Sequence, residues 1–339
     1  MQPAGRRSVA DIALQGRSLR VDDFSSRARV LSRLRAGNIF FYSLTRAAAI
    51  TVLVVLGCAI LSLTYGAMPA LRQFGLSFLI DETWNPVTEQ FGALAPIYGT
   101  IVTSFIAMLI AVPIGLMIAL FLTELCPQSL RRPIGIAIEL LAGIPSIIYG
   151  IWGLFIFAPF LQSTLQPALI ATLGKVPVLS SLFEGPPYGI GILTASLILS
   201  VMVLPFITSI TRDVFEATPT VLKEAAHGLG CTTWEVVRYV VLPYCRVGVI
   251  GGVMLGLGRA LGETMAVTFV IGNAHRISAS ILAPGTTISA AIANEFTEAV
   301  GELYTSSLIL LGLILFVITL IVLAIARYML MRLERRIGA

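Results

Sequence analysis

The chain has 339 residues, of which 57% are hydrophobic and only 12% are charged, and its mean hydropathy is +0.91. A soluble protein of this length cannot bury so much apolar surface, because polar side chains must still cover its outside. The composition therefore excludes an ordinary soluble enzyme or binding domain, and it indicates an all-α protein that crosses a membrane several times.

The chain has a net charge of +5, and its N-terminal tail, residues 1–45, is rich in arginine. The first apolar run starts near Ala47 and has no small-residue cleavage motif at its end. It is long enough to span a membrane, so we expect an uncleaved first helix. A basic run beside a membrane helix usually faces anionic lipid. We therefore expect membrane lipid, and no nucleic acid, as the partner of this tail.

Six segments each offer the roughly 20 apolar residues that a membrane helix needs. They are 47–66, 100–122, 134–158, 188–211, 247–271 and 304–327. Lys and Arg are concentrated in both tails, in the loop after the second segment and in loop 212–246, whereas the opposite side carries only Arg72, Lys175 and Arg276. The positive-inside rule then places both termini in the cytoplasm, in agreement with an even number of spans.

The cysteines and histidines show no metal-ligand pattern. The four cysteines lie in or near apolar segments without paired spacing, and we expect them to be reduced: Cys58, Cys126, Cys231 and Cys245. His227 and His275 are far apart, and neither has a neighbouring Cys or His. The sequence therefore predicts no metal site.

The loop 212–246 contains a predicted short helix. Thr218 followed by Pro219 is typical of a helix start, with Thr at the N-cap and Pro at the first helical position. Gly228 and Gly230 are expected to end this helix. Between these signals, four apolar residues recur at helical spacing and predict one small apolar face: Leu222, Ala225, Ala226 and Leu229.

A second helix is predicted directly after the first, because Thr232 and Glu235 have the spacing of a capping box. Leu242-Pro243 is expected to close this second helix before the fifth segment. A small apolar face permits close approach by another protein, and this favours docking of the first helix into a partner's groove. The alternative is a loop helix that lies on the membrane surface of its own protein.

The run Glu224-Ala225-Ala226, followed by Gly230 and then by Leu242-Pro243, resembles the EAA motif of binding-protein-dependent ABC importer permeases. The resemblance covers residues 97–327 and implies a type-1 permease domain with both termini cytoplasmic. It also implies that loop 212–246, with Lys223 and Gly228, forms a coupling helix in a cleft of an ATPase subunit. Residues 46–96 would then hold the first membrane helix and an outer loop, and residues 328–339 a basic cytoplasmic tail.

We expect ATP to bind to another subunit and not to this chain. The chain has two lysines, Lys175 and Lys223, and neither lies in a phosphate-binding G-x-x-x-x-G-K-[ST] loop. There is also no catalytic triad or metal cluster in the sequence, so we expect a transport subunit and not an enzyme. The chain itself is expected to bind no cofactor, and a separate subunit is expected to hydrolyse ATP.

Arg259 and Glu263 interrupt the apolar fifth segment. A charge at membrane depth costs a few kcal/mol or more, so such residues usually face a bundle interior or a water-filled path. If the helix is continuous, their spacing of four places them on one face, where they can pair. The same face carries a stripe of Gly248, Gly252 and Gly256, which lets a second helix approach closely.

This charged pair has two interpretations. As an anion path, Arg259 would bind a tetrahedral oxyanion through its forked donors. Glu263 could accept a hydrogen bond from hydrogen phosphate, which sulfate cannot offer, and hydroxyls of Thr264 and Thr268 lie on a neighbouring face. The alternative is a buried ion pair that only fixes helix register.

Glu139 is a further charge in the third segment, and Gly143-Ile144-Pro145-Ser146 follows it. Pro145 predicts a kink or break, and a broken helix can direct backbone N–H groups toward an anion. We therefore count Glu139 and Ser146 among candidate path residues. The alternative is that Glu139 lies near the membrane boundary and Pro145 merely bends the helix.

Two further runs are similar to phosphate-specific importer permeases: Gly258-Arg259-Ala260-Leu261-Gly262-Glu263-Thr264-Met265-Ala266-Val267 and Glu139-Leu140-Leu141-Ala142-Gly143-Ile144-Pro145-Ser146. The Met-Ala-Val after Gly-Glu-Thr resembles the PstC type of these permeases. The resemblance implies import of inorganic phosphate across a bacterial inner membrane. It also implies a complex with a PstA-type permease, two PstB-type ATPase subunits and an external PstS-type phosphate-binding protein.

Other functions remain open on the residues alone. The oxyanion could be sulfate, molybdate or phosphonate. A secondary anion transporter driven by protons or sodium would need no ATPase, and the EAA-like loop argues against it. A membrane scaffold or sensor would need no charged pair at membrane depth.

Overall fold

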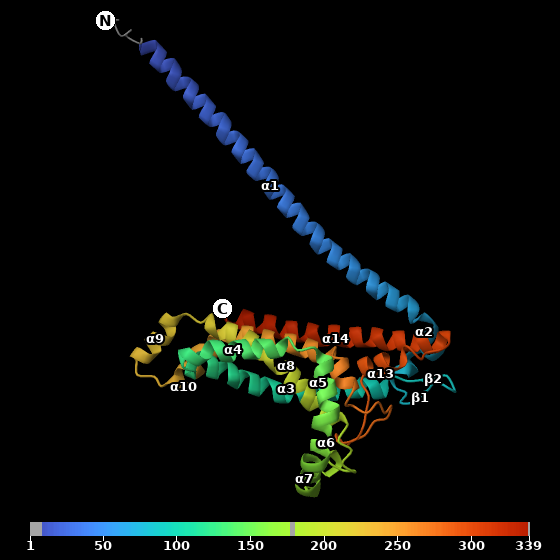
Figure 1. The fold of residues 1–339 in the computed structure, drawn as a ribbon. Helices are drawn as coiled ribbons and strands as arrows, with labels where there is room; N and C mark the ends of the chain where they lie inside the picture. Colours follow the sequence, from blue (N-terminus) through green and yellow to red (C-terminus); the bar gives the residue numbers. More distant parts are fainter. Residues whose placement is uncertain (1–8, 177–179, 338–339) are drawn as a thin grey trace. The chain divides into compact units, whose positions relative to one another are not determined.

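The computed structural model describes residues 9–176 and 180–337, with side chains described for 38–176 and 180–332. The chain divides into two compact units, Met1–Ser62 and Leu63–Ala339. Helix α1 (Val9–Gly66) provides the described part of the first unit and ends just inside the second (Figure 1). The second unit contains every other helix and the single described β-hairpin.

The helices of the second unit follow one another with short connections. In chain order they are α2 (Met68–Phe74), α3 (Leu94–Leu120), α4 (Gln128–Ala142), α5 (Ser146–Trp152), α6 (Ala158–Phe160), α7 (Gln166–Thr172), α8 (Ile192–Glu216), α9 (Thr220–Gly228), α10 (Thr233–Val236), α11 (Leu242–Leu261), α12 (Met265–Thr268), α13 (Ile288–Glu295) and α14 (Glu302–Ile337). Strands β1 (Trp84–Asn85) and β2 (Gln90–Phe91) form an antiparallel hairpin between α2 and α3.

Six described helical segments are long and apolar enough to cross a membrane, which confirms the predicted number. They are Asn38–Gly66, Leu94–Leu125, Ser146–Lys175, Ile192–Glu216, Thr233–Leu261 and Glu302–Arg332. The third and fifth differ from the predicted ranges 134–158 and 247–271. The third span begins after a break in the helix, and the fifth begins early because α10 continues into α11. Hydropathy detects neither the break nor the continuation.

Helix α8 is the centre of the second unit. It buries 67% of its most apolar window inside the protein, whereas no other candidate span buries more than 33%. Helices α3, α4 and α11 all pack against it, and Figure 1 shows α3, α4, α8 and α14 running alongside one another. A buried, mostly aliphatic cluster joins α8 to α3 and α12, and it includes Tyr149 of α5 and Ala260 of α11.

The glycine stripe of α11 is the surface that contacts α8, as the sequence predicts. A Cβ atom at Gly252 would lie 2.8 Å from the side chain of Ile210, and one at Gly256 would lie 2.8 Å from Ile207. Gly248 meets Val214 at 2.6 Å in the same way. In a membrane, helix association depends on such close packing, because lipid removes the hydrophobic drive.

The predicted helix 134–158 is broken at Pro145, and the third span begins only after this break, at Ser146. Helix α4 stops at Ala142 and α5 begins at Ser146, because Pro145 has no backbone N–H and disfavours helical geometry before it. The Tyr149 hydroxyl donates to the Leu141 carbonyl at 2.8 Å, and the Ile144 N–H donates to the same carbonyl at 3.3 Å, so this end of α4 stays bonded across the break. The helix then continues to Lys175 through two π-helical turns.

The fifth span runs from Thr233 to Leu261, so Leu242-Pro243 does not close a helix as predicted. A π-helical turn, Val237–Val241, joins α10 directly to α11 just before Pro243. The wider turn accommodates the proline, which lacks an N–H and would otherwise disrupt the hydrogen-bond ladder. The C-terminal end of this span also differs from the prediction, because Gly262 stops the helix well before residue 271.

The hairpin end of the second unit is held together by one carboxylate. Glu295 accepts hydrogen bonds from Trp84 Nε1 at 2.6 Å, from His275 Nε2 at 2.7 Å and from the Tyr304 hydroxyl at 2.8 Å. The Trp84 and His275 rings stack with their centroids 5.0 Å apart. Glu295 therefore ties β1, the loop after α12, α13 and the start of α14 to one another. Burial alone would raise the pKa of Glu295, but these hydrogen bonds outweigh it and leave the pKa below its ordinary value.

A first prediction concerns the α8–α11 contact. Gly252→Ala should lower the free energy of unfolding by about 1–3 kcal/mol, because its methyl group must displace Ile210. Gly251 is the matched control, since nothing lies within 4 Å of a Cβ atom there and alanine favours the helix. Thermal unfolding in detergent micelles measures both variants. Equal melting temperatures for the two would contradict the packing.

A second prediction concerns pH. Since the folded pKa of Glu295 is depressed, its contribution to stability is complete above the ordinary carboxyl pKa and is lost as pH falls through the folded value. Glu295→Gln should therefore melt at a lower temperature near pH 7, and the gap to the unmodified protein should close under acid conditions. The exposed Glu298→Gln is the control. An unchanged gap across this pH range would show that the ionised carboxylate is not responsible.

Candidate functional site

Arg259 and Glu263 lie on either side of a helix end and do not form the predicted pair. Helix α11 ends at Leu261, so the two residues do not share one helix face, and no ion pair joins them among the described residues. Arg259 is exposed in the last turn of α11, with its Cζ atom 6.0 Å from the centre of the Phe206 ring. Both the predicted pairing and the alternative of a register-fixing ion pair are therefore wrong.

Glu263 lies in the break itself, two residues after α11 ends and two residues before α12 begins. Its Oε1 atom accepts the backbone N–H of Ala266 at 3.4 Å, and the side chain is half-buried. Thr264 and Thr268 donate their hydroxyl protons to nearby carbonyls, of Gly262 at 3.4 Å and of Thr264 at 2.8 Å. The threonines therefore retain acceptor lone pairs, while Arg259 retains its donors.

The start of the third span and the segment that follows the fifth span meet directly. A Cβ atom at Gly150 of α5 would lie 3.0 Å from the carbonyl oxygen of Met265 and 2.8 Å from the Phe269 ring. Ser146, at the start of α5, is half-buried. Discontinuous helices that meet at membrane depth are typical of substrate sites in transporters. The structure thus joins the segments of Ser146 and Thr264, although no contact between those two side chains is among the described bonds.

Glu139 has a different place from the one we expected. It is exposed on α4, and its Oε1 atom accepts from Arg212 Nη2 of α8 at 2.8 Å. Arg212 also binds Asp213 at 3.1 Å, and its side chain is only 18% exposed. A Cβ atom at Gly135 would lie 2.7 Å from the Arg212 guanidinium. Glu139 thus takes part in an α4–α8 link, and its role on a substrate path stays a prediction.

Sequence reasoning missed Arg212 as the partner of Glu139. The two residues are separated by 73 positions, so no local spacing connects them. The available signal was charge balance, because Arg212 lies in an apolar segment, where a charge usually pairs with another. Gly135, one turn before Glu139, was a second signal, since glycine in a helix often marks a close approach.

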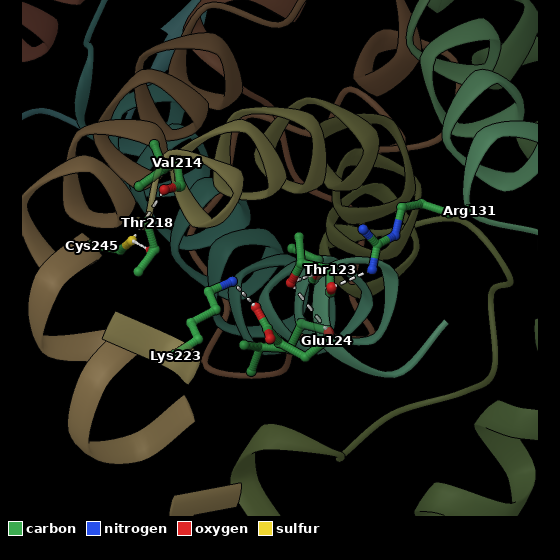
Figure 2. A network of polar contacts seen from close by, with 9 residues as sticks. Thr123, Glu124, Arg131, Val214, Thr218, Lys223 and Cys245 are labelled. Atoms are coloured by element: carbon green, nitrogen blue, oxygen red, sulfur yellow. Dashed lines mark hydrogen bonds and ion pairs between the residues drawn. The ribbon is translucent and has the colours of Figure 1, made fainter. Parts of the chain in front are cut away.

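Helix α9 begins at Thr220, one residue later than predicted, with Pro219 at the N-cap position. Thr218 is not the cap. It is 3% exposed, and its hydroxyl lies 3.0 Å from Cys245 Sγ, which donates to the Val214 carbonyl at 3.1 Å (Figure 2). The helix ends at Gly228 as predicted, and Gly230 has a φ of +90°, which favours glycine.

The second predicted helix start is confirmed. The Thr232 hydroxyl accepts the N–H of Glu235, and the Glu235 carboxylate accepts the N–H of Thr232, which together form a capping box. The helix it starts continues through Leu242 and Pro243 into α11. These two residues therefore lie inside a long helix and not at a loop boundary.

The predicted apolar face of α9 is divided between two sides. Ala226 is buried in a cluster with side chains of α3, α8 and α11, whereas Leu229 is 87% exposed. Val221 and Leu222 are exposed with it, and so are Glu224 and Ala225. This apolar surface lies between two candidate spans, outside any membrane-crossing segment. Exposed apolar surface in such a place is typical of an interaction site.

Lys223 points to the inner side of α9. Its Nζ atom lies 2.6 Å from Oε1 of Glu124, in the π-helical turn Phe121–Leu125 that ends the second span (Figure 2). The side chains are 19% and 11% exposed. Sequence reasoning named Lys223 only as part of the loop motif, and it did not identify Glu124.

Comparison with known proteins identifies the family. The model of the family described as "Binding-protein-dependent transport system inner membrane component" matches residues 111–335. A "Phosphate transport system permease protein PstC" of Mesorhizobium japonicum is 69% identical over 93% of this chain and 96% of its own length. The protein of the same name from Pasteurella multocida is 57% identical over 88% of this chain and 93% of its own.

Two solved ABC transporter structures contain chains with a fold similar to that of this chain. A bacterial alginate ABC transporter, solved with an alginate pentasaccharide-bound periplasmic protein, contains a chain with a TM-score of 0.56 and 18% identity. The match covers 87% of this chain and 94% of that one. An inward-facing MetNI methionine ABC transporter gives a TM-score of 0.53 at 16% identity, over 74% of this chain and 99% of that one. The chain is thus a multi-pass ABC importer permease that belongs to the family of binding-protein-dependent transport system inner membrane components, within its PstC group.

Proposed function

We propose that the chain is one permease subunit of an ATP-driven importer that carries inorganic phosphate into the cell. The relatives named PstC support the substrate, with 69% identity over nearly the whole chain in one of them. The observation that carries the site is Arg259, an exposed guanidinium at a helix break with no carboxylate partner in the described part of the chain. An unpaired arginine at membrane depth is expensive, and this cost indicates a functional role.

The chemistry of the break suits hydrogen phosphate. Arg259 offers forked donors that match a tetrahedral oxyanion, and it is always charged. Glu263, two residues beyond the end of α11, offers a half-buried carboxylate that can accept a hydrogen bond from hydrogen phosphate. Sulfate has no such proton at neutral pH, so the carboxylate would repel it. Thr264, Thr268 and Ser146 supply further oxygens near the same break.

The α9 surface is the site where an ATPase subunit would dock. Its exposed residues Val221, Leu222, Ala225 and Leu229 form an apolar patch beside exposed Glu224. We propose two PstB-type ATPase subunits, of which one contacts this chain here, and ATP bound on them. A PstA-type permease and an external PstS-type phosphate-binding protein complete the complex. In this arrangement both termini are cytoplasmic and the membrane is the bacterial inner membrane.

In the proposed cycle, closure of the ATPase subunits around ATP displaces α9 and α10. Because α10 continues without interruption into α11, this displacement reaches the end of α11 that carries Arg259. The two permeases then change from inward-facing to outward-facing, and the binding protein delivers phosphate to the break between α11 and α12. A permease for another oxyanion is the second candidate, since Arg259 alone would accept sulfate or molybdate.

A third prediction tests the path. Arg259→Gln should lower ATP-driven phosphate uptake by about tenfold or more, because it removes charge-assisted hydrogen bonds to the ion. Uptake of radioactive phosphate into proteoliposomes that contain the complete transporter measures this. Arg276→Gln, which changes another exposed arginine, is the control and should transport normally. Full uptake by the Arg259 variant would refute the role of this residue in the path.

A fourth prediction tests docking. Leu229→Glu should weaken association with the ATPase subunit by about tenfold or more, because the side chain would bury an unpaired charge in the interface. Val300→Glu is the matched control, since Val300 is 88% exposed and lies between α13 and α14. Co-purification of the ATPase subunit with each permease variant measures the effect. Equal recovery of the ATPase subunit with both variants would show that α9 is not the docking site.

A further inference from the structure

The ion pair between Lys223 and Glu124 connects the predicted docking helix to the second span. Its two atoms are 2.6 Å apart and both side chains are more than four-fifths covered. Figure 2 shows the lysine reaching from α9 toward the last turn after α3. Low exposure reduces competition from water, so a charge-assisted contact of this kind is strong and fixed in direction.

The other inward contact of α9 is of a different kind. Ala226 packs in an apolar cluster with Ala119, Phe215 and Val241. Apolar packing is not directional, so it fixes the position of α9 less sharply than a bond between two defined atoms does. The ion pair has a defined partner atom, and a shift of α9 must therefore either carry Glu124 along or break the contact.

Both ends of this contact are anchored further. Arg131 Nη2 donates to the carbonyl of Thr123, which is in the same turn as Glu124 (Figure 2). Before α9, the contact of Thr218 with Cys245 joins the chain to α11. Helix α3 in turn packs along α8. A displacement that reaches Glu124 is thus applied to a firmly held turn of a long helix.

We propose that the Lys223–Glu124 pair is the link through which displacement of α9 is passed to α3, and from α3 to α8. The two residues are positioning residues, since neither lies at the helix break of the phosphate path. The proposal depends on the proposed function, in which an ATPase subunit moves α9. It adds that the apolar contacts of α9 do not transmit this movement by themselves.

The experiment measures phosphate transported per ATP hydrolysed by the complete transporter in proteoliposomes, together with co-purification of the ATPase subunit. The variants are Lys223→Met, Glu124→Leu, their combination, and the exchange Lys223→Glu with Glu124→Lys. The control is Lys175→Met, which changes the other lysine of the chain, an exposed one. The combined apolar variant matters because replacement of a buried pair by apolar side chains often preserves stability.

The combined apolar variant should assemble normally but transport about fivefold less phosphate per ATP, or still less. The exchanged pair should recover most of the ratio. A single variant that fails to assemble leaves these two variants to decide. A normal ratio in the combined apolar variant, or an exchanged pair that assembles without recovery, would overturn the link. If the proposed function itself were wrong, the results would differ, because Leu229→Glu would then leave ATPase binding unchanged.

Discussion

The burial of α8 is the constraint on which the rest of the second unit depends. Helices α3, α4, α5, α11 and α12 all pack against this one helix, and in a membrane they must do so by close packing. Four of these contacts have a glycine in the neighbouring helix or directly after it. A Cβ atom would approach the α8 side chain at 3.2 Å or less in every case: Gly115 of α3 with Ile207, Gly135 of α4 with Arg212, Gly252 of α11 with Ile210, and, directly after α5, Gly153 with Ile198.

Polar contacts are gathered at the two ends of this packed centre. Glu295 ties three segments at the hairpin end, and the pairs Lys223–Glu124 and Arg212–Glu139 tie helices near α9. Between these ends lie the breaks of the third and fifth spans, where Arg259 has no carboxylate partner among the described residues. The charges that hold the fold and the charges available to an ion are therefore in different places.

Hydropathy predicted the number of spans, because length and apolarity alone decide whether a helix can cross a membrane. It did not predict where the backbone breaks. Pro145 did indicate a break, but Pro243 did not cause one, since a π-helical turn absorbs it. The pairing of Arg259 with Glu263 was wrong for the same reason, because a spacing of four has meaning only in a continuous helix.

Side-chain contacts between residues distant in the sequence were not predicted, because no local spacing connects them. Glu124 and Lys223 are 99 positions apart, and Glu139 and Arg212 are 73 apart. The glycine stripe of α11 was predictable, since it needs only periodicity within one helix. The EAA-like run correctly predicted the helix α9, yet only the structure shows that Ala226 faces inward while Ala225 faces outward.

The contact between α5 and α12 has a mechanical consequence. Gly150 lies against the main chain at Met265 and Ala266, and no hydrogen bond or ion pair joins the two helices within the described ranges. Two helices in contact without such bonds can slide along one another more easily than two bonded helices. Since no polar bond crosses this contact in the described part of the chain, a displacement of α5 against α12 disrupts only van der Waals contacts. A passage that opens there would need no bond to be broken.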